Sequence, residues 1–283
     1  MKRFDRTFTS ADGLTLAAME RGPDGGPLAL LAHGGGQTHW AWRNTVAALA
    51  EAGFRAVAID LRGHGDSDWA PNGDYRHSAF AADVLAVADQ LDGPVALVGA
   101  SLGGMAGIIA EGMLRPGSFS SLTLVDITPK PDPEGVARIT GFMGAHVEQG
   151  FASPAEAAEA IAAYTPNRQK RGPSDSLNRY LRLGDDGRYR WHWDPAFLTG
   201  VNGPRLDEYG ELDAAARALK LPVHLIRGGS SDLVSLDAVA QFKTQVPHAR
   251  FTDIAGAGHM VVGDRNDSFS DAIISFLLEE RIP

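Results

Sequence analysis

The chain has 283 residues, of which 44% are hydrophobic and 22% are charged, and its formal net charge is -9. This length and composition predict a soluble globular protein with a sizeable core, and the acidic balance without a basic cluster argues against nucleic-acid binding. The sequence contains no cysteine, which excludes disulfides, thiolate metal sites and a cysteine nucleophile.

No apolar run approaches the length of a membrane span. The first residues, Met1 to Arg6, carry charges where a signal peptide would have its apolar segment. We therefore expect a cytoplasmic protein that does not associate with membranes.

Loosely alternating residues at 3–9 and 14–20 predict a β-hairpin. Short continuous apolar runs then predict strands that are buried on both faces, and apolar residues at helical spacing separate most of them. These runs are residues 28–32, 55–60, 94–98, 122–126, 221–228 and 250–254. Strands that alternate with helices predict a mostly parallel sheet with helices on both faces.

The alternation breaks between residues 127 and 218. A proline-rich stretch, residues 129–133, opens this region, and helical segments and several aromatic residues follow. Since the strand pattern resumes afterwards, we predict a core domain of residues 1–126 and 219–283 with a mostly helical cap inserted at 127–218.

One stretch carries the strongest chemical signal. The apolar run at 94–98 stops at Gly99-Ala100-Ser101-Leu102-Gly103, and a helix-compatible segment begins at once. A serine on so tight a strand-to-helix turn is a G-x-S-x-G nucleophile elbow, because glycines two residues on either side remove the Cβ atoms that would collide. We predict that Ser101 is a nucleophile.

A serine nucleophile needs a base and a third group that orients the base. Among nine histidines, His259 follows the last strand and a glycine-rich loop, so we predict that it is the base. Asp232, just past the strand at 221–228, is the favoured acid. Asp126, at the end of the strand after the elbow, is the alternative, although a loop-anchoring role suits it better.

Acyl transfer also needs fixed N–H donors for the developing oxyanion. We expect the Leu102 amide, at the start of the helix, to be one of them. The second is expected from the loop His33-Gly34-Gly35-Gly36, where bare backbone can approach a ligand closely. We favour the Gly35 amide, and the Gly36 amide is the alternative.

These motifs resemble those of α/β-hydrolases of the epoxide-hydrolase-like or haloperoxidase-like branch. The resemblance also includes residues 60–67, Gly229-Ser230-Ser231-Asp232 and Gly258-His259. It implies an α/β fold with a mostly parallel eight-stranded sheet, one antiparallel strand and a helical cap after the sixth strand. In that family residues 60–67 would be a structural signature.

Epoxide hydrolases and haloalkane dehalogenases of this branch carry an aspartate at the elbow, whereas this chain has Ser101. A serine cannot supply the carboxylate that opens an epoxide, so both activities are disfavoured. We predict a serine hydrolase for a small carboxylic ester, lactone or thioester. Hydrolysis of a C–C bond or an amide, perhydrolysis, and a non-catalytic small-molecule receptor on the same fold stay as alternatives.

The substrate pocket is the least readable part of the chain. We expect four tryptophans to contribute to it, although packing explains each of them about as well: Trp40, Trp42, Trp191 and Trp193. The predicted chemistry requires neither a cofactor nor a metal, the expected partner is a small acyl substrate, and the sequence does not define an oligomeric state.

Overall fold

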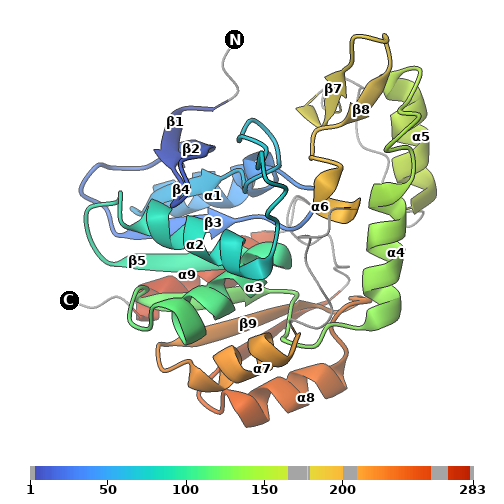
Figure 1. The fold of residues 1–283 in the computed structure, drawn as a ribbon. Coiled ribbons are helices and arrows are strands. Elements are labelled where there is room, and N and C mark those ends of the chain that lie inside the picture. Colours follow the sequence, from blue (N-terminus) through green and yellow to red (C-terminus); the bar gives the residue numbers. More distant parts are fainter. Residues whose placement is uncertain (1–3, 165–176, 178, 200–208, 256–266, 281–283) are drawn as a thin grey trace.

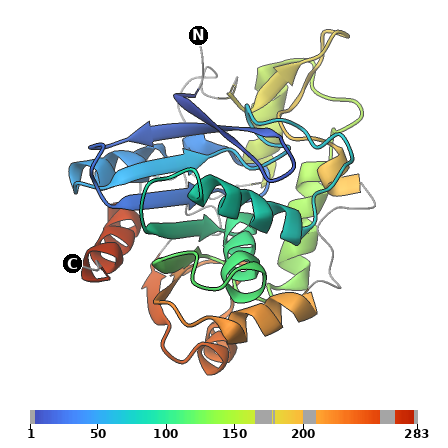
Figure 2. The same ribbon diagram turned by 60° about the vertical axis from the view of Figure 1, so that its left-hand side comes forward.

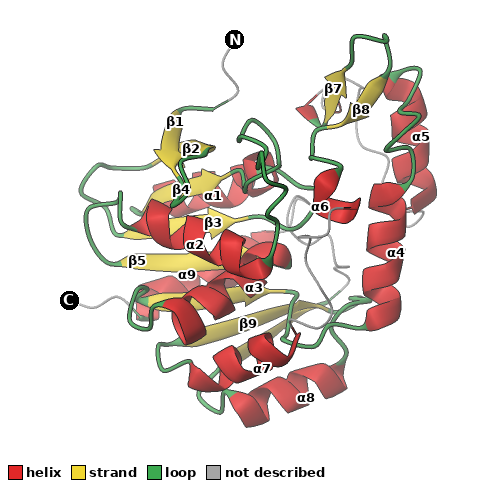
Figure 3. Cartoon of the chain, in the orientation of Figure 1, coloured by secondary structure: helices red, strands yellow, loops and turns green. Residues whose placement is uncertain are grey.

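The computed structural model describes residues 4–164, 177, 179–199, 209–255 and 267–280. Eight strands form one twisted sheet (Figures 1 and 3). In spatial order they are β1 (Arg6–Thr9), β2 (Thr15–Arg21), β4 (Arg55–Ile59), β3 (Leu28–Ala32), β5 (Val95–Ala100), β6 (Ser121–Val125), β9 (Val223–Gly228) and β10 (Arg250–Ile254). Strand β2 runs opposite to the other seven strands of this sheet, in agreement with the one antiparallel strand that the resemblance implied.

Helices cover both faces of the sheet (Figure 2). One face carries α2 (His77–Ala88), α3 (Leu102–Ile109) with its π-helical continuation η2 (Ala110–Leu114), α7 (Tyr209–Ala218) and α8 (Leu236–Gln245). The other face carries α1 (Arg43–Glu51), which follows the 3-10 turn η1 (His39–Trp42), and α9 (Asp267–Glu279). This arrangement confirms the predicted α/β architecture.

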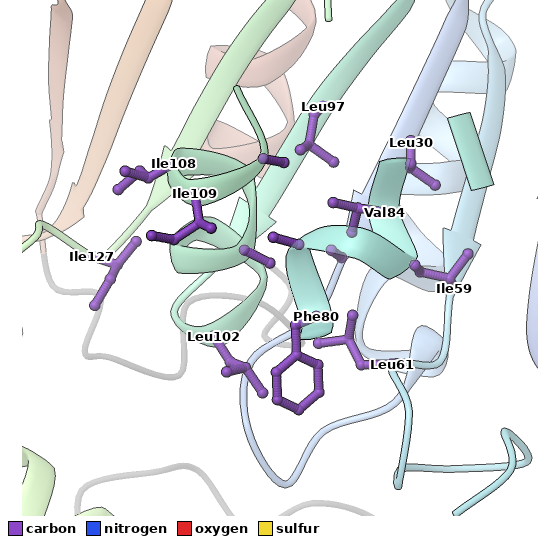
Figure 4. Packing of buried hydrophobic residues seen from close by; sticks show 14 of the residues in the cluster. Leu30, Ile59, Leu61, Phe80, Val84, Leu97, Leu102, Ile108, Ile109 and Ile127 are labelled. Atoms are coloured by element: carbon purple, nitrogen blue, oxygen red, sulfur yellow. The ribbon is translucent and has the colours of Figure 1, made fainter. Parts of the chain in front are cut away.

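The continuous apolar runs follow from this sandwich. In β3, Leu28 and Leu30 point into the core beneath α2 and α3, and Ala29 and Leu31 point toward α1 and α9. Figure 4 shows the first of these cores, in which Leu30 of β3 and Val84 of α2 belong to the same buried cluster. Each fully buried leucine or valine contributes about 1.5–3 kcal/mol. A strand buried on both faces therefore shows a nearly continuous apolar run instead of an alternating one.

The cap lies beside the carboxyl ends of the parallel strands, to the right in Figure 1. It comprises α4 (Pro133–Gly144), α5 (Pro154–Tyr164), the short strands β7 (Leu181–Leu183) and β8 (Tyr189–Trp191), and α6 (Ala196–Thr199). The Asp132 side chain accepts a hydrogen bond from the Gly135 amide and so caps α4. The antiparallel pair β7–β8 was not predicted, because strands of three residues are too short to show a period.

Helix α7 packs with the core, so the cap ends before residue 218, where we predicted its end. Leu212 and Ala216 are fully buried in the core under α3. The contact is so close that a Cβ atom at Gly112 would lie 2.0 Å from the Ala215 carbonyl oxygen. The core layers therefore resume at α7. An amphipathic helix has the same sequence pattern whether it packs on a sheet or in a cap, so the pattern could not place this boundary.

None of the helices in the described ranges is both long and apolar enough to cross a membrane.

A buried ion pair fixes the loop after β4 to α2. The Arg62 guanidinium donates two hydrogen bonds of 2.6 Å to the Asp83 carboxylate, and both side chains are at most 2% exposed. It also bonds to Asp12 at 3.0 and 3.1 Å. This network holds the loop that leads to the cap-facing end of the sheet.

We predict that Asp83→Ala lowers the free energy of unfolding by about 3–5 kcal/mol, because it leaves a buried guanidinium without its main partner. The matched control is Asp89→Ala. Asp89 pairs with Arg115 just as well, at 2.8 and 2.9 Å, but this pair is exposed and should contribute no more than about 1 kcal/mol. Urea unfolding of both variants tests this, and equal losses would contradict it.

Candidate active site

The predicted nucleophile lies on a strained turn between β5 and α3. Ser101 has φ 45° and ψ -111°, a backbone conformation that costs an L-residue free energy and that clusters at functional sites. The Ser101 amide donates to the Val125 carbonyl at 3.0 Å, which ties the turn to β6. Within the described part of the chain, only Asp126 and His146 share positive φ among residues other than glycine.

Glycines are required around this turn by close backbone approaches. A Cβ atom at Gly99 would lie 2.4 Å from the Gly103 carbonyl oxygen, and one at Gly103 would lie 2.4 Å from the Ala32 carbonyl oxygen. A Cβ atom at Gly104 would lie 2.5 Å from the Ile127 side chain. Strand β5, helix α3 and the end of β3 therefore meet at distances that only glycine permits.

The glycine loop after β3 lies against Ser101. Residues Gly34 to Gln37 form a tight turn, here named the oxyanion turn, in which the Gln37 amide donates to the Gly34 carbonyl at 3.1 Å. Gly36 occupies its third position with φ 72°, as a turn of this kind requires. A Cβ atom at Gly34 would lie 3.3 Å from the Ser101 Cβ atom.

Both predicted oxyanion donors have unused N–H groups. Neither the Gly35 amide nor the Leu102 amide donates a hydrogen bond to any partner among the described residues. Leu102 is the first residue of α3, where the helix dipole is positive. The oxyanion turn and the start of α3 thus each contain one predicted oxyanion donor that has no partner among the described residues.

Asp126, the alternative acid, is buried and held by hydrogen bonds. It is 1% exposed and has φ 50°, directly after β6. Its carboxylate accepts hydrogen bonds from the Gly228 amide at 2.9 Å and from the Ser231 hydroxyl at 2.6 Å. The Ser231 hydroxyl in turn accepts from the amides of Leu233 and Val234, both at 3.1 Å. The loop-anchoring role that we expected of Asp126 is therefore present.

Asp232 lies in more exposed surroundings. Its side chain is 37% exposed and forms an ion pair with Arg138 of α4, whose side chain is 53% exposed. Asp232 is not needed to cap α8, because Ser235 accepts the hydrogen bond from the Ala238 amide. The acid favoured from the sequence is thus held by the cap, whereas the alternative is held inside the core.

The predicted base, His259, and the neighbouring Gly258 lie outside the described residues.

Cap side chains cover the oxyanion turn with an apolar surface. A Cβ atom at Gly35 would lie 3.5 Å from the Phe197 ring and 3.9 Å from the Met143 sulfur. One at Gly36 would lie 3.3 Å from the Trp193 ring. Sequence reasoning missed Phe197 and Met143 as site residues, because an apolar residue in a cap helix has no signal that distinguishes a pocket wall from packing.

The four tryptophans that we expected at the pocket differ in their positions. Trp193 lies against the oxyanion turn, and Trp191 stacks on it with ring centroids 5.0 Å apart. Trp40 is half-buried in η1. Trp42 is fully buried and stacks on Phe269 at 6.0 Å. Trp42 therefore belongs to the core on the α1 and α9 face, and its predicted place in the substrate pocket is wrong.

Three buried histidine rings lie in a row beneath the oxyanion turn, around the buried Asp60. The centroids of His33 and His64 are 5.3 Å apart, and those of His64 and His192 are 6.0 Å apart. Burial lowers the pKa of His33 to about 3 and that of His64 to about 4, and it also lowers the pKa of His192 well below its ordinary value. All three rings are therefore neutral near pH 7.

Among the side chains that the structure describes, no three histidine, cysteine, aspartate or glutamate residues group so that they could hold a metal ion.

Comparisons with known proteins agree with this fold. Residues 29–272 match the model of the alpha/beta hydrolase family. The chain is 30% identical to esterase Rv0045c of Mycobacterium tuberculosis, over 84% of this chain and 78% of the esterase. It is also 30% identical to the 2-(acetamidomethylene)succinate hydrolase of Mesorhizobium japonicum, over 88% of this chain and 86% of that enzyme. The crystal structure of an E-2-(acetamidomethylene)succinate hydrolase has a TM-score of 0.79 and 27% identity, and the match covers 96% of this chain and 98% of that one.

The three buried histidines predict that the protein loses stability in mild acid. Their pKa values are lower in the folded chain than the unfolded value of about 6.5, so the unfolded chain binds more protons as the pH falls below 6.5. We expect each histidine to lower the free energy of unfolding by about 2 kcal/mol between pH 7 and pH 5.

Urea unfolding at the two pH values measures this loss, and His64→Asn should reduce it by about 2 kcal/mol. The control is His146→Asn, because His146 is exposed in the cap and asparagine tolerates its positive φ. If the free energy of unfolding falls equally between pH 7 and pH 5 in the wild type and in His64→Asn, the buried His64 ring is not a source of the acid sensitivity.

Proposed function

This chain belongs to the alpha/beta hydrolase family, and on that premise we propose that it cleaves a small carboxylic ester, lactone or thioester through an acyl-enzyme on Ser101. The match to the family model and the similarity to an esterase and a hydrolase show that the chain is an enzyme with hydrolase activity. The observation that carries the finer proposal is the strained Ser101 beside two unused amide donors, Gly35 and Leu102.

The proposed reaction has two halves. The Ser101 Oγ attacks the acyl carbon while His259 takes its proton, and the carbonyl oxygen becomes an oxyanion that the Gly35 and Leu102 amides stabilise. The C–O or C–S bond then breaks, and His259 protonates the departing alcohol or thiol. A water molecule, deprotonated by His259, attacks the acyl-enzyme and releases the carboxylic acid and free Ser101.

We propose Asp126, in place of Asp232, as the residue that orients His259. An orienting acid must stabilise an imidazolium, and a buried carboxylate does so more strongly than an exposed one that already faces a guanidinium. Asp126 is buried and fixed by two donors, whereas Asp232 pairs with Arg138 at the surface. In addition, Asp126 follows β6, which is hydrogen-bonded to the Ser101 turn.

The proposed substrate has an apolar acyl group. Phe197, Met143 and Trp193 lie over the oxyanion turn, and an apolar wall there favours a carbon chain or ring over a charged group. We also propose that the protein acts in the cytoplasm on a small molecule, as the sequence suggested.

We predict that Ser101→Ala lowers kcat for p-nitrophenyl esters by at least about 10⁴-fold, because the acyl-enzyme can no longer form. Steady-state hydrolysis assays with acetate, butyrate and hexanoate esters measure this, and circular dichroism checks that the variant folds. A wild type that binds acyl compounds without turnover would contradict the proposal and favour a receptor on this fold.

The two candidate acids can be separated by matched substitutions. Asp126→Asn should lower kcat by about 10³- to 10⁴-fold, since the amide cannot stabilise the imidazolium or fix its tautomer. Asp232→Asn should lower kcat less than about 10-fold, because it removes only an exposed ion pair. Loss of activity confined to Asp232→Asn would return the acid role to Asp232.

A further inference from the structure

The oxyanion turn needs anchors outside itself. Three consecutive glycines, Gly34 to Gly36, have few steric limits on φ and ψ, yet an oxyanion donor works only when its position is fixed before the reaction. Two local hydrogen bonds act on the first residue of the turn: the ring of the preceding His33 donates to the Gly34 carbonyl at 2.8 Å, and the Gly34 amide donates within the turn to the Gln37 side chain at 3.0 Å.

An anchor for the other end of the turn comes from the cap. The His192 Nε2 atom lies 3.3 Å from the Gly36 carbonyl oxygen, and the ring is 2% exposed. The Gly36 carbonyl is part of the peptide bond to Gln37, whose amide closes the turn. Gly36 is also the residue with φ 72°. Among the residues that the structure describes, no other donor contacts this carbonyl.

The direction of this hydrogen bond follows from the other side of the ring. The Gly65 amide donates to the His192 Nδ1 atom at 2.7 Å, so Nδ1 carries a lone pair and no proton. A neutral imidazole then has its proton on Nε2. The ring can therefore donate to the Gly36 carbonyl, and it links the loop after β4 to the oxyanion turn.

The segment that carries His192 is itself fixed to the core. The Asp194 amide donates to the Gly63 carbonyl at 2.8 Å, and the Asp194 carboxylate accepts from the Tyr75 hydroxyl at 2.6 Å. Trp193, between the two, packs on Gly36. The ring is thus held in place before a substrate arrives.

We propose that His192 is a positioning residue, supplied by the cap, which fixes the oxyanion turn through the Gly36 carbonyl and so couples the seating of the cap to the acyl-transfer step. This inference rests on the proposed serine hydrolase chemistry. It assigns no proton transfer to His192, because the ring keeps the same tautomer throughout and touches neither the substrate nor Ser101 in the proposed reaction.

Two substitutions separate the hydrogen bonds of the ring. In His192→Asn, the side-chain oxygen can still accept from the Gly65 amide, but no atom reaches the Gly36 carbonyl. In His192→Gln, the longer amide can place its NH₂ group where Nε2 lies, so the donor to Gly36 is kept. His224→Asn is the control: His224 is also buried, at 1% exposed, but bonds to Thr252.

We expect His192→Asn to lower kcat for p-nitrophenyl butyrate by about 10- to 10²-fold, as for a small misplacement of a catalytic group, while KM changes less than about 3-fold. His192→Gln should recover most of kcat, and His224→Asn should keep kcat within about 2-fold of the wild type. The inhibition constant of a trifluoromethyl ketone, which forms an oxyanion on serine, should rise in His192→Asn in proportion to the loss in kcat/KM.

Unchanged kcat in His192→Asn, or equal losses in the Asn and Gln variants, would overturn the positioning role while leaving the serine hydrolase intact. A ¹⁵N spectrum of histidine-labelled wild type gives a readout independent of turnover, with the signal that His192→Asn removes identifying the ring. It should show His192 with its proton on Nε2 between pH 6 and pH 8. A proton on Nδ1 would also overturn the proposal, even for a chain that hydrolysed no ester.

Discussion

The close approach of β3, β5 and α3 around Ser101 is the constraint on which the rest of the structure depends. Cβ atoms at Gly99 and Gly103 would each lie 2.4 Å from a backbone oxygen, so the turn exists only because these side chains are absent. The same approach brings the oxyanion turn to Ser101 and places the Leu102 amide at the start of a helix. A strained serine and its candidate oxyanion donors are therefore consequences of a single backbone geometry.

The second organising feature is the polar contact between cap and core. Asp194 and His192 bond to backbone groups of the loops after β3 and β4, and apolar side chains of the cap cover the same loops. The cap thus closes the site with an apolar wall and is fixed beside it by hydrogen bonds. Because apolar contacts are not directional and hydrogen bonds are, the hydrogen bonds define the position of the cap.

The sequence predicted what is local or periodic. Apolar runs gave the buried strands, and the glycines around Ser101 gave the elbow, because both signals lie within a few neighbouring residues. Contacts of distant segments could not be predicted. His192 meets Gly65 and Gly36 across 127 and 156 residues, and the burial of Asp126 depends on how the loop after β9 folds over it. Asp126 and Asp232 both follow strand ends, so spacing alone could not rank them.

The most direct test of the account is peptide mass spectrometry after incubation with a fluorophosphonate, which forms a stable adduct with an activated serine. The account predicts a single adduct, located on Ser101, that is absent from the Ser101→Ala variant and forms much more slowly in Asp126→Asn. A folded wild type that forms no adduct, or one that is modified at a different residue, would contradict the central claim that this turn carries the nucleophile.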